Sequence, residues 1–111
     1  MNRVIFATDR LRLDVSSAEE HGEIVYLLTG DEQPSPFRPE NVVDDFTNRL
    51  DELEFNPERD YIALSGPAFL TSMLLATVCK RCDRHVNVLL FDATNDRYVS
   101  RPFTAKSQRY A

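Results

Sequence analysis

The stretch from Tyr61 to Phe91 reads YIALSGPAFLTSMLLATVCKRCDRHVNVLLF, and its order of elements decides the fold. A short β-type run, residues 61–64, turns through a Ser-Gly-Pro tripeptide into an apolar stretch of helical length, residues 68–82. A second β-type run follows at residues 86–91. Because a strand, a helix and a strand joined by short links form crossovers between parallel strands, this stretch predicts an α/β fold.

The same order of elements precedes this stretch. The run IVYLL, residues 24–28, is predicted to be the first central strand, buried on both faces. Residues 40–55 place apolar side chains at helical spacing, with acids on the rest of the wheel. Three prolines stiffen the intervening loop, residues 31–39. Two further extended candidates, residues 4–7 and 11–15, lie near the amino end.

The carboxyl end returns along the sheet. Residues 92–96 have the composition of a hairpin turn, and residues 97–100 are predicted to return antiparallel. We therefore expect one Rossmann-like α/β domain of two or three layers, spanning residues 1–102, with a flexible tail at residues 103–111. Its sheet is expected to be mostly parallel, with about four or five strands, two main helices and a C-terminal antiparallel strand.

Composition places the chain among packed, non-membrane proteins. The longest apolar run, residues 68–78, is far shorter than the roughly 20 residues that a membrane span needs. The first residues, MNRVIFATDR, lack the apolar core of a secretion signal, and two nearby cysteines suit a reducing compartment. We expect a cytoplasmic protein without a membrane partner.

Charge is divided unevenly along the chain. Residues 1–79 carry 6 basic and 15 acidic side chains, whereas residues 80–111 carry 7 basic and 3 acidic ones, within an overall net charge of −5. The basic end could meet an acidic partner or the acidic part of another copy. The low pI, about 4.9, disfavours nucleic acid as that partner.

The helix at residues 68–82 is apolar on nearly every side, so more than the sheet must cover it. Either the first helix and the N-terminal segment wrap it, or a second subunit does, with a symmetric dimer the simplest assembly. The leading hypothesis is therefore a self-associating interaction protein that binds another macromolecule through this helix or through the basic C-terminal segment. Its candidate contact residues are Phe69, Met73, Arg97, Tyr98, Arg101 and Arg109.

An alternative hypothesis places a ligand at the edge of the sheet where the parallel strands end. Ligands of open α/β sheets bind there, and the backbone N–H groups at a helix start favour anions. The small or polar residues that follow the predicted strands are Thr29, Gly30, Ser65, Gly66 and Asp92. These residues predict a site for a nucleotide or another phosphate-bearing ligand.

Other chemistry has little support. Cys79, Cys82 and His85 have the spacing of zinc ligands, but a structural zinc site needs a fourth, so we expect structural cysteines and no cofactor. Ser65 follows a predicted strand, whereas His21 and His85 precede strands and belong at the opposite edge. No nucleophile and base can be paired, so we expect a non-enzymatic protein.

The C-terminal half carries a resemblance to known proteins. Residues 60–67 (DYIALSGP), the apolar helix, residues 86–92 (VNVLLFD) and residues 96–99 (DRYV) resemble short uncharacterised proteins encoded by tailed bacteriophages and related mobile elements. The resemblance implies an accessory protein that acts in the cytoplasm of an infected bacterium. It transfers no functional residues.

Overall fold

The computed structural model describes residues 2–30, 38–82 and 84–104. Five strands form one sheet in the order β2-β1-β3-β4-β5, in which the first four are parallel and β5 is antiparallel to β4. The strands are β1 (Arg3–Thr8), β2 (Glu23–Leu28), β3 (Tyr61–Ala63), β4 (Val86–Asp92) and β5 (Arg97–Phe103). The predicted α/β fold, with a mostly parallel sheet and a C-terminal antiparallel strand, is confirmed.

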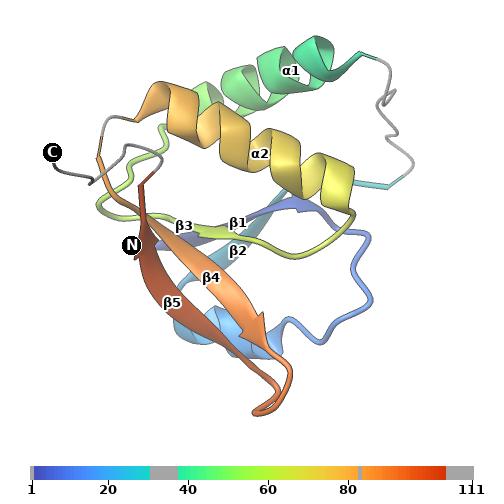
Figure 1. Cartoon of the computed structure of the whole chain (residues 1–111), viewed down its shortest axis with the longest axis vertical. Helices are drawn as coiled ribbons and strands as arrows, with labels where there is room; N and C mark the ends of the chain where they lie inside the picture. Colours follow the sequence, from blue (N-terminus) through green and yellow to red (C-terminus); the bar gives the residue numbers. More distant parts are fainter. Residues whose placement is uncertain (1, 31–37, 83, 105–111) are drawn as a thin grey trace, which may run out of the picture.

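Both α-helices cover one face of this sheet. Helix α1 (Pro39–Glu52) connects β2 to β3, and α2 (Ala68–Arg81) connects β3 to β4; the two helices pack against each other (Figure 1). The connection from β1 to β2 instead crosses the other face through the 3-10 helix η1 (Ser16–Glu20). The domain therefore has two full layers, with η1 as a partial third. No helix among the described residues is long and apolar enough to cross a lipid bilayer.

Strand β1 is an interior strand between β2 and β3, which corrects the prediction that residues 24–28 form the first central strand. Val4, Ile5, Phe6 and Ala7 are fully buried, and their side chains alternate between the two faces of the sheet. Strand β2 lies at the edge, because the short η1 connection carries the chain outward from β1. Apolar composition marks both strands, but the connections set their order in the sheet.

The second N-terminal extended candidate, residues 11–15, is a loop and not a strand. Its Leu11 and Val15 pack against the cluster of buried side chains on the η1 face of the sheet. The alternation of apolar and polar residues there reflects a loop that lies along the protein with one side buried. Periodicity alone does not distinguish this loop from a strand.

Helix α2 is covered by α1 and the sheet, while the N-terminal segment lies on the opposite face. Phe69 and Met73 are half-buried and pack against the helix-face core. Arg81 of α2 also pairs with Asp51 of α1 at 2.6 Å. The outward stripe of α2 is formed by small residues and one lysine: Ala68, Ser72, Ala76 and Lys80.

Strand β5 forms one edge of the sheet, and η1 covers the start of that edge. The backbone N–H of Tyr98 donates to Ser17 Oγ at 3.0 Å, and the Tyr98 carbonyl oxygen lies 3.4 Å from His21 Nε2. The backbone groups of Tyr98 therefore point away from β4. The Ser17 hydroxyl thus binds the backbone of β5, and the start of η1 is held by Asp14, whose Oδ1 accepts the backbone N–H of Ser16 at 2.9 Å.

The rest of this edge is also poorly suited to pairing. Because backbone direction alternates along a strand, Ser100 and Pro102 also point their backbone groups outward. The Arg101 guanidinium donates to the Ser100 carbonyl at 2.7 Å, and Pro102 has no N–H to donate. The outer edge of β5 is therefore a poor template for an added strand. This strand runs to Phe103, one residue beyond the predicted domain boundary.

A buried carboxylate joins β1 to the segment that leads into β3. Asp60 has no exposed surface and accepts hydrogen bonds from Arg3 at 3.0 Å, from Arg59 at 2.9 Å and from the backbone N–H of Asn56 at 3.0 Å. Arg3 also donates to the Leu53 carbonyl. Burial alone would raise the pKa of Asp60, but the donors from Arg59, Arg3 and Asn56 outweigh it and lower the pKa to about 2.

We expect Asp60→Asn to lower the free energy of unfolding by about 2–3 kcal/mol at pH 7, because two guanidiniums lose their buried counter-charge. The folded pKa, about 2, lies below the ordinary 3.8, so this stabilisation is complete above pH 3.8 and is lost as the pH falls through about 2. Urea unfolding at pH 7 and at several acidic pH values measures both effects.

The control for this experiment is Asp45→Asn, which removes the exposed i,i+4 partner of Arg49. This change should alter stability by less than about 0.5 kcal/mol. Equal losses in the two variants, or a difference between them that did not shrink in acid, would contradict the role given to Asp60.

Candidate functional site

The chain changes direction between the neighbouring strands β1 and β3. After β1 it leaves across the η1 face toward β2, whereas after β3 it leaves across the helix face toward β4 (Figure 1). Loops that diverge from adjacent parallel strands leave a crevice between them at the carboxyl edge of the sheet. This position is the topological switch point at which open α/β proteins bind ligands.

A cavity of about 420 Å³ lies at this position. We call it the switch-point pocket; it is lined by Arg10, Arg12, Leu13, Gly66 and Pro67. The first three residues come from the loop after β1, and the other two form the turn between β3 and α2. Two guanidiniums therefore belong to the wall of one pocket at the start of a helix.

Hydrogen bonds join the loop after β1 to the end of β2. Arg10 Nε donates to the Gly30 carbonyl at 2.9 Å, and the Gly30 N–H donates to Asp9 Oδ2 at 3.2 Å. Asp9 N–H in turn donates to the Leu28 carbonyl at 3.1 Å, which continues the β1–β2 ladder. The base of the loop that carries Arg10 and Arg12 is thus fixed to the sheet.

Gly66 is required by the shape of the turn on the other side of the pocket. Its φ is +117°, a backbone conformation that side chains disfavour. A Cβ at this position would lie 3.1 Å from Leu11 Cδ2 and 3.8 Å from Thr71 Oγ1. That Thr71 hydroxyl is buried and has no hydrogen-bond partner among the described residues. Helix α2 starts directly after the turn, with Pro67 as its N-cap residue.

The structure divides the five predicted rim residues. Gly66 lines the pocket. The Gly30 carbonyl accepts a hydrogen bond from Arg10, which also lines the pocket, and the exposed Thr29 precedes Gly30 in the chain. Ser65 is only 6% exposed, and its Oγ accepts the Tyr98 hydroxyl at 2.9 Å. Ser65 therefore supports the core beneath the turn and does not face a ligand.

Asp92 lies away from the pocket, at the tip of the β4–β5 hairpin. Its carboxylate accepts the Asn95 side-chain amide at 2.7 Å and the backbone N–H groups of Asn95 and Thr94. The Asn95 side chain and backbone are the main causes that lower the pKa of Asp92. Strand β4 continues beyond its pairing with β3, which ends at Leu89, so Asp92 is carried past the rim. Its role is to close a turn.

The two arginines of the pocket were not predicted. Arg10 and Arg12 alternate with Leu11 and Leu13, and that alternation indicated a strand. The sequence did contain a signal for these arginines, because the loop that carries them directly follows an apolar run predicted to be a strand. The crossover that begins with this loop creates the switch point. Recognising it required the strand order, which the sequence pattern does not contain.

The predicted interaction residues also differ in their exposure to solvent. Arg97 and Arg101 are exposed on β5, whereas Tyr98 is 2% exposed and is a core residue with Phe6 and Phe91 as ring neighbours. Tyr98 is therefore unavailable to a partner in this fold. Arg109 lies outside the described residues.

The hairpin exposes an apolar face on the helix side of the sheet. Val86 and Val88 point to that side, so their cross-strand partners Phe103 and Arg101 do as well, together with the pair Leu90 and Val99. Leu90 is 40% exposed and Phe103 36%. We call this surface the hairpin face; it comprises Leu90, Asp92, Arg97, Val99, Arg101 and Phe103.

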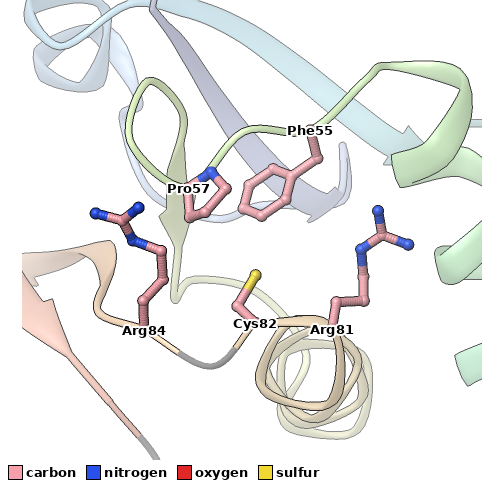
Figure 2. A pocket seen from close by; sticks show the side chains of 5 residues that line it. All are labelled: Phe55, Pro57, Arg81, Cys82 and Arg84. Atoms are coloured by element: carbon pink, nitrogen blue, oxygen red, sulfur yellow. The ribbon is translucent and has the colours of Figure 1, made fainter.

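A second cavity, of about 470 Å³, lies at the end of α2. Figure 2 shows the Cys82 sulfur directed toward the Phe55 ring and Pro57, with Arg81 and Arg84 on either side. Arg81 pairs with Asp51, and Arg84 pairs with Glu58. Arg81 and Arg84 therefore each have a carboxylate partner, which reduces the attraction of this cavity for anions.

Cys79, Cys82 and His85, which have the spacing of zinc ligands, do not gather into a metal site among the described residues. Cys79 and Cys82 are half-buried cysteines, and His85 is exposed. Burial raises the pKa of the Cys79 thiol, which disfavours a thiolate ligand. Across residues 2–30, 38–82 and 84–104, no three His, Cys, Asp or Glu side chains gather as a metal site would require.

We expect Gly66→Ala to lower the free energy of unfolding by about 2 kcal/mol, since the new methyl meets Leu11 and the backbone keeps a disfavoured φ. Gly30→Ala is the matched control, because Gly30 also has a positive φ but nothing lies within 4 Å of its Cβ position. Its loss should be about 1 kcal/mol. Urea unfolding measures both, and equal losses would show that the close approach at Gly66 is unimportant.

Comparison with protein families matches residues 7–105 to the family described as Phage Pam3 gp32-like protein. The comparisons with curated proteins and with solved structures gave no match. The family match includes the loop that carries Arg10 and Arg12, the turn at Gly66 and the whole β4–β5 hairpin. It confirms the resemblance to phage proteins and extends it beyond the C-terminal half. The chain belongs to the Phage Pam3 gp32-like protein family.

Proposed function

We propose that this phage protein is an accessory protein that acts by binding, in the cytoplasm of the host bacterium, and that the switch-point pocket holds a small phosphate-bearing anion. The observation that carries this proposal is the meeting of Arg10 and Arg12 with the Gly66–Pro67 turn in one cavity at the switch point. A reducing cytoplasm also suits two cysteines that lie only three positions apart in the sequence.

The charges of the pocket favour an anion. Guanidinium groups bind phosphate through paired, charge-assisted hydrogen bonds. Arg12 is exposed and has no ion pair among the described residues, so its positive charge has no carboxylate to neutralise it. The N–H groups in the first turn of α2 have no acceptor within the helix, and the helix dipole adds positive potential beside them.

The surroundings of the pocket support binding more than catalysis. The hydroxyl of Ser65, the serine that follows β3, accepts a hydrogen bond from Tyr98 beneath the turn. His21 and His85 precede β2 and β4, so both lie near the amino edge of the sheet. Neither histidine is therefore placed to act as a general base at the pocket.

We expect Arg12→Ala to weaken pyrophosphate binding at least tenfold, because a charge-assisted hydrogen bond to phosphate contributes about 1.5–3 kcal/mol. Lys80→Ala is the matched control: Lys80 is an exposed cation at the far end of α2. Isothermal titration calorimetry at low ionic strength measures the affinities. Equal binding by both variants, or no binding by the unaltered protein, would refute the proposed site.

The hairpin face supports a second candidate function, self-association into a symmetric dimer. The blocked outer edge of β5 disfavours pairing edge to edge, so the contact we propose is face to face. A two-fold axis parallel to the strands sets β4 of one copy against β5 of the other. Leu90 then meets Val99, and Asp92 meets Arg97, so that apolar and opposite-charge groups both match.

We expect the protein to sediment as a dimer at about 100 μM, and Leu90→Glu to convert it to a monomer, because two carboxylates would be buried without partners. Leu13→Glu is the matched control, since Leu13 is also 40% exposed but lies outside the hairpin face. Sedimentation velocity separates the outcomes. A monomeric unaltered protein, or dissociation by both variants alike, would remove this candidate.

A further inference from the structure

We infer that the ligand of the switch-point pocket is a nucleoside phosphate and not a bare phosphate; the inference rests on the proposed function. The inference is based on the apolar half of the pocket, which lies beside the two arginines. A bound phosphate alone would leave this apolar surface exposed. The pocket combines groups suited to a charged end and to a ring in one ligand.

Leu13 and Pro67 form this apolar half. Leu13 is 40% exposed, and among the described residues only Leu90 and Phe103 are large apolar side chains of comparable exposure. Both of those lie on the hairpin face, whereas Leu13 stands alone beside Arg10 and Arg12. Small-molecule pockets have this composition, with apolar walls that hold a ring and a few polar groups that fix its orientation.

The size of the pocket supports the same ligand class. Its volume, about 420 Å³, lies within the range of roughly 300–1,000 Å³ that is usual for organic ligands. A phosphate ion displaces only a few water molecules, at about 30 Å³ each. A sugar and a base would use the rest of the space, and their rings would cover Leu13.

The positions of the charges fix the direction of the ligand. Phosphate is favoured at Gly66 and the first turn of α2, where the backbone comes close without a side chain in between. The base then extends along the loop toward Leu13. No side chain among the pocket-lining residues, Arg10, Arg12, Leu13, Gly66 and Pro67, is a hydrogen-bond acceptor, so we expect little discrimination between bases.

The test compares AMP, GMP, CMP, ribose 5-phosphate and inorganic phosphate by isothermal titration calorimetry. AMP should bind at least tenfold more tightly than ribose 5-phosphate, which lacks only the base, and the three nucleotides should agree within about threefold. Leu13→Ala should weaken AMP binding about fivefold through lost apolar contact while leaving ribose 5-phosphate unchanged. Arg12→Ala should weaken the binding of all five compounds.

Leu90→Ala is the matched control for Leu13→Ala, because the two leucines have the same exposed fraction, 40%, and Leu90 is outside the pocket. Equal affinity for AMP and ribose 5-phosphate, or equal effects of the two leucine variants, would overturn the nucleoside inference and leave the phosphate site standing. Binding of none of the five compounds would overturn both proposals.

Discussion

Strand β1 is the constraint on which the rest of the structure depends, because it is the strand whose two faces are both fully covered. Its buried side chains alternate between the core under α1 and α2 and the core over η1. The connection that follows β1 covers one face of the sheet through η1, whereas α1 and α2, which connect the later strands, cover the other, so β1 lies between two covering layers. The switch point between β1 and β3 follows from that position. The pocket is therefore a consequence of how the core is built.

The same arrangement determines which arginines remain available. At the amino edge, Arg3 and Arg59 pair with the buried Asp60, and Arg84 pairs with Glu58. At the carboxyl edge, no carboxylate pairs with Arg12 among the described residues. The chain carries net negative charge, yet two arginines, Arg10 and Arg12, line the pocket where the strands end. Overall charge thus says little about the ligand preference of one pocket.

Much of the fold could be predicted from the sequence, because most helices and strands are indicated by local patterns of apolar and turn residues. The run from Tyr61 to Phe91 has β-type and helical segments of clear length, and both helices and the hairpin follow from periodicity and turn residues. The order of the strands could not be predicted in the same way. Residues 24–28 form an edge strand that neighbouring elements cover only in part. Such a strand can have the same apolar composition as a strand in the interior of the sheet, so composition does not reveal its position.

The candidate site was predictable only in part, for a related reason. Gly66 was found because a tight turn placed directly between a strand and a helix favours a residue that tolerates positive φ. Arg10 and Arg12 were missed because a loop with one buried side imitates strand alternation, and Asp92 was misplaced because β4 extends beyond its partner β3. Tyr98 was assigned to the surface from its basic neighbours, although its alternate position on β5 turns it into the core. Residues in regular elements were thus placed by pattern, whereas the residues that define the pocket depend on where two connections diverge, which is a property of the assembled sheet.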